Sequence, residues 1–213
     1  MFVAWRSGDP ITPLGAAGML WILFAVSWLA MSFGRKPARR RENLLERLFH
    51  RLYLAAAFIL LYASDPRFGS LRHRFLPREP WLEYLGVAVT AAGIAFAIWA
   101  RRHIGKQWSA EVEIREDHEL IATGPYASIR HPIYTGILLA MLGTAIIGGE
   151  WRGLVAVALA TLGFWIKARK EERFLEQEFG AAYAEHRERT GFFLPRFGPG
   201  PRRPREAQSS SSV

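Results

Sequence analysis

The most constraining feature of the sequence is a run of twenty residues, Leu14 to Phe33, that contains no charged side chain. A helix rises about 1.5 Å per residue, so a run of this length crosses a hydrocarbon core about 30 Å thick. Five basic residues follow the run, at residues 35–41, whereas only Arg6 precedes it. A signal peptide carries its positive charges before the apolar run, so this order favours a membrane anchor. We therefore expect an integral membrane protein.

Further apolar segments lie at residues 81–100, 133–149 and 154–166, and a shorter one at 52–64 is long enough to span if it begins near residue 48. The short connector between the last two spans predicts a helical hairpin. No segment alternates with the two-residue period of a membrane barrel strand. We expect an all-α fold: a polytopic integral membrane protein with about five transmembrane helices, or four, and a cytoplasmic C-terminal helix extension.

The net charge of +9 is explained by the distribution of basic residues along the chain. With five spans, segments 34–51, 101–132 and 167–213 share one side of the membrane and hold 22 of the 28 lysines and arginines. The positive-inside rule makes this side cytoplasmic, which places the N-terminus outside and the C-terminus in the cytoplasm. Anionic membrane lipids are then the expected partners of the basic surface, and nucleic acid is not.

The chain divides into three parts by composition. Residues 1–100 hold the N-terminal transmembrane helices and their loops, and residues 101–197 hold the polar segments that are able to carry chemistry. Residues 198–213 form a tail rich in Gly, Pro, Arg and Ser that we expect to be disordered. The chain contains no cysteine, which excludes a disulfide scaffold, a thiolate metal site and a cysteine nucleophile.

The first of these polar segments, residues 118–136, runs from a loop into the hairpin. Gly124 opens a Gly-Pro turn, and Pro132 suits the first turn of a helix, so we expect His131 at the N-cap of the span. The free backbone N–H groups and the helix dipole at this end favour a carboxylate or a phosphate. Arg130 would add a fixed positive charge there.

The second polar segment, residues 167–183, is predicted to continue the last span as a helix beyond the lipid. Its apolar side chains recur at steps of three and four residues and define one amphipathic face, which includes Glu171. The hairpin brings the start of one span and the end of the next to the same membrane surface. We therefore expect His131 and Glu171 to be neighbours despite forty residues of separation.

The motifs between about residues 105 and 195 resemble the isoprenylcysteine carboxyl methyltransferase family, which is related to the phospholipid N-methyltransferases. They read, in order, His-x-Leu-x-x-x-Gly-Pro-Tyr, Arg-His-Pro-x-Tyr-x-Gly, Glu-Glu-x-x-Leu and Phe-Gly-x-x-Tyr. The resemblance implies S-adenosyl-L-methionine as cofactor and a lipophilic, isoprenylcysteine-like small molecule as methyl acceptor. Matched motif by motif, it implies these cofactor-binding residues: His118, Glu119, Leu120, Ile121, Gly124, Tyr126, His131, Pro132, Ile133, Tyr134, Glu171 and Glu172.

One position departs from the family pattern. Family members that methylate prenylated cysteine place an arginine one helical turn before the Glu pair, where it orients the substrate carboxylate. Lys167 occupies this position, with Arg169 two residues later. Lysine keeps the positive charge but lacks the paired N–H donors with which arginine binds both oxygens of a carboxylate. The resemblance therefore implies a carboxylate acceptor less strongly than an arginine at this position would. Within this resemblance, Lys167, Arg169 and Arg130 are the expected catalytic residues.

Other acceptors and other functions stay open at this stage. A carboxylate acceptor is already ionised at neutral pH, whereas an amine or a thiol would need a base such as Glu171, Glu172 or His131. The six histidines are dispersed without close ligand spacing, so we expect no metal site. The main alternative to an enzyme is a membrane scaffold or binding protein, and nothing in the sequence indicates an oligomeric state.

Overall fold

The computed structural model describes residues 12–32, 44–63, 66–105 and 120–196. Their elements are α1 (Pro13–Ala30), α2 (Leu44–Tyr62), η1 (Pro66–Arg72), α3 (Pro80–Ile104), η3 (Gly124–Ala127), α4 (Pro132–Gly148), α5 (Trp151–Phe179) and α6 (Ala181–Arg189). The predicted all-α class is confirmed, since these ranges hold helices and no strand. The predicted cofactor residues His118 and Glu119 and the tail at 198–213 lie outside them.

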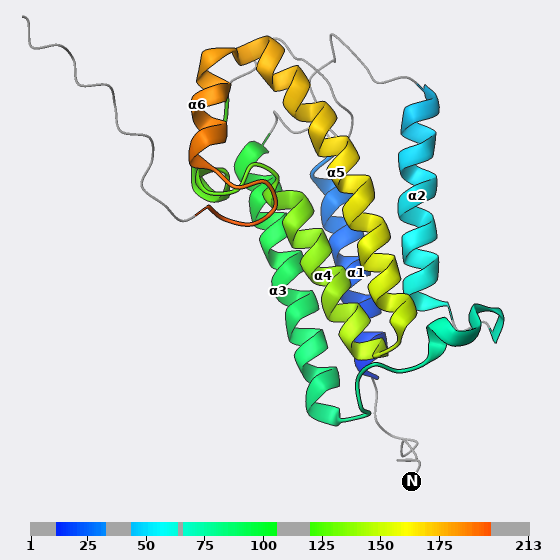
Figure 1. Ribbon diagram of the computed structural model, residues 1–213. Coiled ribbons are helices and arrows are strands. Elements are labelled where there is room, and N and C mark those ends of the chain that lie inside the picture. Colours follow the sequence, from blue (N-terminus) through cyan, green and yellow to red (C-terminus); the bar gives the residue numbers. More distant parts are fainter. Residues whose placement is uncertain (1–11, 33–43, 64–65, 106–119, 197–213) are drawn as a thin grey trace, which may run out of the picture.

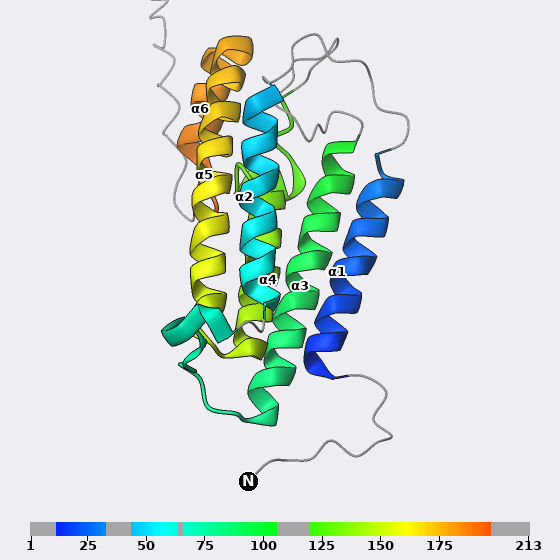
Figure 2. The same ribbon diagram turned by 90° about the vertical axis from the view of Figure 1, so that its right-hand side faces the viewer.

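The five long helices α1 to α5 stand side by side in one bundle (Figure 1). Helix α1 packs beside α3, and α2 packs beside α5, so α1 and α2 flank the bundle at different places (Figure 2). Helix α4 contacts each of the other four long helices. Side chains of all five long helices therefore meet around α4.

Three of the helices are long and apolar enough to cross a membrane: Pro13–Ala30, Pro80–Ile104 and Trp151–Phe179. Shorter apolar helices cover Leu48–Tyr62 and Pro132–Gly148. Many large apolar side chains of these helices lie exposed on the outside of the bundle, as expected for groups that face lipid. Ile22 and Leu29 of α1 are examples. The membrane character is thus supported, while the count of five spans stays a prediction.

Helices α3 and α4 approach each other closely through glycines on their facing sides. A Cβ atom on Gly93 would lie 2.4 Å from the backbone nitrogen of Ala140, and one on Gly143 would lie equally close to the backbone nitrogen of Thr90. Small residues allow such close packing of helices in membranes, where van der Waals contact replaces the hydrophobic driving force. This contact fixes α4 against α3 and thereby orients the N-terminus of α4.

The predicted hairpin between α4 and α5 is present. Helix α4 ends at Gly148. The next residue, Gly149, caps it with a φ of 63°, which lies in the left-handed region that glycine adopts without strain, and α5 begins at Trp151. Arg74 donates a hydrogen bond of 2.6 Å to the carbonyl of Gly148. Arg152, at the start of α5, donates to the carbonyls of Leu60 and Leu61 at the end of α2. The turn is therefore tied to both neighbouring segments.

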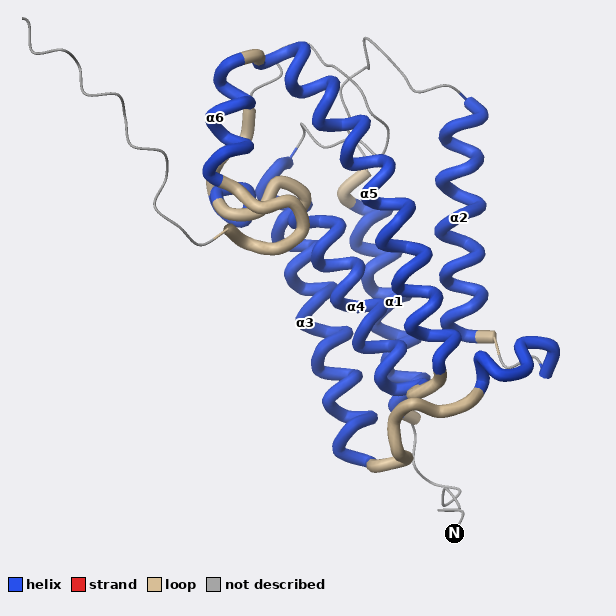
Figure 3. The backbone as a smooth tube through the Cα atoms, viewed as in Figure 1, coloured by secondary structure: helices blue, strands red, loops and turns tan. Residues whose placement is uncertain are grey.

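The prediction that the last helix continues unbroken to residue 183 is wrong. Helix α5 ends at Phe179, and Gly180, with a φ of 50°, turns the chain into the separate helix α6. A positive φ is strained for residues with a Cβ, so the glycine is the physical reason for the break. Helix α6 then runs back toward the bundle (Figure 3), which returns residues 190–196 to the N-terminus of α4.

Candidate active site

His131 is the N-cap residue of α4, and Pro132 occupies the first turn, as the sequence predicts. The histidine is buried, with 7% of its surface exposed. Its backbone carbonyl accepts a hydrogen bond from the Thr135 backbone N–H at 3.1 Å and lies 3.2 Å from the Thr135 hydroxyl. These contacts fix the backbone of His131, and its imidazole lies at the end of α4 that faces the extension of α5.

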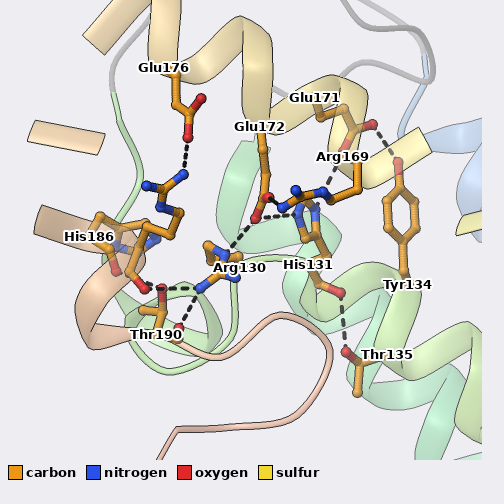
Figure 4. Close-up of polar contacts among 11 residues, drawn as sticks. Arg130, His131, Tyr134, Thr135, Arg169, Glu171, Glu172, Glu176, His186 and Thr190 are labelled. Atoms are coloured by element: carbon orange, nitrogen blue, oxygen red, sulfur yellow. Dashed lines mark hydrogen bonds and ion pairs between the residues drawn. The ribbon is translucent and has the colours of Figure 1, made fainter. Parts of the chain in front are cut away.

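Two adjacent carboxylates of α5 face the imidazole of His131 (Figure 4). Its Nδ1 lies 3.5 Å from Oε2 of Glu171, and its Nε2 lies 3.5 Å from Oε1 of Glu172. The predicted proximity of His131 and Glu171 is confirmed. Among the described residues, the buried Nε2 atom forms no hydrogen bond within normal limits.

Tyr134 joins the two helices of the hairpin one turn after His131. Its hydroxyl donates a hydrogen bond of 2.5 Å to Oε1 of Glu171. Its ring lies nearly parallel to that of His131, with centroids 5.7 Å apart, and stacks on Phe164 of α5 at 4.6 Å. Tyr134 thus links the aromatic rings of His131 and Phe164 to the carboxylate of Glu171.

Glu172 is almost fully buried, and its negative charge is balanced by arginines. The Nε atom of Arg130 lies 2.6 Å from its Oε1, and Arg169 lies 3.3 Å from its Oε2. Arg130 also donates to the backbone carbonyls of Thr190 at 2.5 Å and Arg187 at 3.0 Å. The guanidinium of Arg130 therefore connects α5 to the end of α6, a role that sequence analysis missed.

A short strap of residues 191–193 covers the N-terminus of α4. The backbone N–H groups of Arg130 and His131 donate to the carbonyls of Gly191 and Phe192, at 2.9 and 3.2 Å. The ring of Phe192 lies 4.9 Å from that of His131. These bonds occupy the backbone donors of the two residues that precede Pro132. The Phe-Gly pair at residues 179–180 was the available signal that the chain reverses toward this end.

The charges in the cluster shift the pKa values of its members. Burial alone would lower the pKa of His131, but the two carboxylates outweigh this effect and raise it. Burial likewise opposes ionisation of Glu172, and His131 and Arg130 overcome it, which lowers its pKa to about 2. The pKa of Glu171 is lowered in the same way by His131, Lys167 and Tyr134 against the effect of burial. A cationic imidazole between two carboxylates is the favoured state.

The loop before α4 supplies a second, mostly apolar wall. Tyr126 and Ile133 are buried against Ala100 of α3, and Ile121 packs beside them. Gly124 has a φ of 58°, and a Cβ there would lie 2.5 Å from the ring of His103. Burial and then the charge of Glu171 raise the pKa of Tyr126, so its phenol stays neutral.

The remaining predicted residues occupy different surroundings. Pro132 is buried beneath the cluster, and Leu120 is half-buried at the start of the described loop. Arg169 is largely exposed and reaches Glu172 from the outer side. Lys167 is half-buried one helical turn before Glu171, near enough for its charge to favour the ionised carboxylate. The structure thus gathers the predicted residues that it describes, from both segments, at one end of the bundle.

Comparisons with known proteins agree with this arrangement. Residues 81–182, which run from α3 to α6, match the family model described as phospholipid methyltransferase. The chain is 28% identical over 123 residues to protein-S-isoprenylcysteine O-methyltransferase B of Arabidopsis thaliana, covering 56% of this chain and 62% of that protein. A probable protein-S-isoprenylcysteine O-methyltransferase of Oryza sativa subsp. indica is 30% identical over 122 residues, covering 55% and 64%.

A bacterial relative carries a different name. The cobalt-zinc-cadmium resistance protein CzcN of Cupriavidus metallidurans is 29% identical over 164 residues, covering 75% of this chain and 69% of that protein. The chain thus spans roughly two thirds of the length of these three relatives. The predicted resemblance to the isoprenylcysteine carboxyl methyltransferases is confirmed by the relatives of that name, and the match to the model described as phospholipid methyltransferase covers just under half of the chain.

Proposed function

We propose that this chain is an integral membrane methyltransferase that uses S-adenosyl-L-methionine to methylate the carboxylate of a lipophilic, isoprenylcysteine-like acceptor. The observation that carries the proposal is the cluster of His131, Tyr134, Glu171 and Glu172 at the end of an apolar bundle. A polar site at this position would receive a water-soluble cofactor from the cytoplasm and a lipid-borne acceptor from the bilayer.

The residues present fit this cofactor. Glu171 keeps 22% of its side chain exposed, and the buried Nε2 atom of His131 has no hydrogen bond among the described residues. A carboxylate is able to bind the amino group or ribose hydroxyls of the cofactor, and the rings of Tyr134 and Tyr126 suit its sulfonium. Bound there, S-adenosyl-L-methionine supplies a methyl group on a positively charged sulfur.

The proposed cofactor site combines the loop, the start of α4 and the extension of α5. Its described members are Leu120, Ile121, Gly124, Tyr126, His131, Pro132, Ile133, Tyr134, Glu171 and Glu172. Glu172 contributes chiefly by orienting His131, since its own carboxylate is bound by Arg130 and Arg169. His118 and Glu119 belong to the proposal on the strength of their motif alone.

The acceptor side of the site is assigned to Lys167, with Arg169 near it. A carboxylate acceptor is ionised at neutral pH, so the protein has to orient it and exclude water, and no side chain has to remove a proton. Arg130 does not fit a direct role at the acceptor, because its described hydrogen bonds hold Glu172 and the carbonyls at the end of α6. We assign Arg130 to positioning Glu172.

The orientation that suits this proposal places the start of α4 and the extension of α5 in the cytoplasm, where the cofactor is made. Segments rich in lysine and arginine lie at this end, as the positive-inside rule requires. The N-terminus would then lie outside and the C-terminus inside. The lipophilic part of the acceptor would lie in the bilayer beside the bundle.

The test is a transfer assay in membranes that contain the full chain. Incubation with methyl-labelled S-adenosyl-L-methionine and N-acetyl-S-farnesyl-L-cysteine should yield label that base releases as methanol, because carboxyl methyl esters are base-labile. Label in phospholipid head groups would instead indicate amine N-methylation, and label in volatile thioethers would indicate thiol methylation. Absence of label from every fraction would favour a scaffold or binding protein.

A further inference from the structure

The cytoplasmic end of α2 brings a histidine to the site that none of the motifs includes. The ring of His50 is half-buried, and its centroid lies 5.9 Å from that of Phe164 on α5. Phe164 in turn stacks on Tyr134, whose hydroxyl binds Glu171. His50 is therefore separated from the proposed catalytic cluster by only two aromatic rings.

Lys167 lies one helical turn after Phe164 on α5, so the two side chains share one face of that helix. Lys167 and Glu171 are four residues apart and thus share one face of α5. Since α2 packs along α5 (Figure 2), His50 and Lys167 belong to the same side of the site.

The surroundings of His50 are those of a lipid-facing helix. Leu48, Phe49 and Leu52 beside it on α2 are exposed apolar side chains, and Phe49 is 70% exposed. Polar side chains in such helices are costly and turn toward the interior, where they commonly mark the path or site of a substrate. The imidazole of His50 follows this rule, since it turns toward Phe164 and not toward lipid.

A carboxylate offers two oxygens, and the ammonium of Lys167 is a compact charge without the paired donors of a guanidinium. The imidazole N–H of His50 supplies a second donor from the neighbouring helix α2. We propose that His50 and Lys167 together bind the carboxylate of the lipophilic acceptor. This inference rests on the proposed function, because it takes the acceptor to be a carboxylate.

The experiment measures binding, so that it does not depend on turnover. The full chain in detergent, saturated with S-adenosylhomocysteine, is titrated with N-acetyl-S-farnesyl-L-cysteine and separately with its carboxamide. The unmodified chain should bind the carboxylate at least about tenfold more tightly, since a hydrogen bond to a charged group is stronger than one to a neutral group. His50→Phe keeps an aromatic ring against Phe164 and removes the donor, so it should reduce this preference clearly, while the charge of Lys167 maintains the remainder.

Two further variants make the result specific. His50→Asn retains an N–H donor and should restore part of the preference. His73→Phe alters an exposed histidine of the opposite end of the bundle and should leave the preference unchanged. Far-ultraviolet circular dichroism and retained S-adenosylhomocysteine binding establish that each variant is folded.

The inference fails if the unmodified chain binds carboxylate and carboxamide equally, or if His50→Phe keeps the full preference. It stands if the preference exists and depends on His50, even where no methyl transfer is detected in membranes. In that case the proposed reaction is wrong while the anion site is right. Conversely, ester formation that His50→Phe leaves intact, with unchanged KM for the acceptor, would retain the proposed function and remove His50 from it.

Discussion

The hydroxyl of Tyr134 donates a hydrogen bond to the carboxylate of Glu171 across the hairpin, at 2.5 Å. This bond joins the first turn of α4 to the part of α5 that extends beyond its apolar run. It orients the one carboxylate of the cluster that remains partly exposed, whereas Glu172 is enclosed by arginines. Glu171 is therefore the acidic group best placed to contact a cofactor.

Tyr134→Phe tests the contribution of this hydrogen bond. The ring and its stacking on Phe164 remain, and Glu171 loses one donor, so we expect binding of S-adenosylhomocysteine to weaken about two- to tenfold, as for a single hydrogen bond. Isothermal titration calorimetry in detergent measures the change. Tyr84→Phe is the matched control, because Tyr84 lies 66% exposed on α3. Equal affinities in Tyr134→Phe and the unmodified chain would contradict the assigned role.

The acidic cluster predicts how stability depends on pH. The pKa of Glu172, which is about 2 in the folded chain, lies below its ordinary value of 4.5, so its contribution is present above pH 4.5 and is lost as the pH falls toward 2. The pKa of His131 is raised above 6.5, so its contribution is complete below pH 6.5 and is lost as the pH rises through the raised value. The apparent Tm should therefore be highest between about pH 5 and 6.5.

The variant Glu172→Gln separates the contribution of this carboxylate from general acid effects. Removing one partner of a buried ion pair costs about 3–5 kcal/mol, so the apparent Tm should fall at neutral pH and depend less on pH below 4.5. Glu178→Gln, at an exposed position of the same helix, should behave as the unmodified chain. A steep acid transition retained in Glu172→Gln would show that other groups cause it.

Gly93→Ala tests the close contact of α3 with α4. The added Cβ would meet backbone atoms of Ala140, which are unable to move aside as a flexible side chain does. We expect a loss of about 1–3 kcal/mol, measured as a lower apparent Tm in detergent. Gly18→Ala is the control, since no atom lies within 4 Å of a Cβ at that position of α1. The account of helix packing is wrong if both substitutions behave alike.

Membrane orientation is a separate prediction. Reporter fusions or cysteine accessibility in cells should place residues 34–51 and the C-terminus on the cytoplasmic side, because the lysines and arginines concentrate there. The chain contains no cysteine, so single cysteines introduced in these segments report without background. A C-terminus found outside would separate the proposed site from the cytosolic cofactor.

The sequence was sufficient to predict the helices and one pair of neighbours. Hydropathy locates long apolar helices because lipid admits only backbones whose hydrogen bonds are satisfied internally. A short connector then implies a hairpin, and Pro132 fixes where α4 begins. These two facts predict that His131 and Glu171 meet, which the structure confirms.

Contacts that depend on how one helix is rotated against its neighbour were not predictable from hydropathy and connector length. The approach of His50 to Phe164 depends on how α2 is rotated against α5, which the sequence of α2 does not specify. The strap of residues 191–193 reaches His131 only because Gly180 reverses the chain. One dihedral angle there decides between a straight extension and a returning helix, and an amphipathic pattern is compatible with both.

Binding of S-adenosylhomocysteine to the purified full chain tests the central claim most directly. The account predicts saturable binding by calorimetry that Glu171→Gln and His131→Ala each weaken at least about tenfold, since each removes a charged partner from the cluster. Circular dichroism should show retained helix in both, and His73→Ala, at an exposed position, should bind normally. No binding by the unmodified chain, or full affinity in both site variants, would contradict the account.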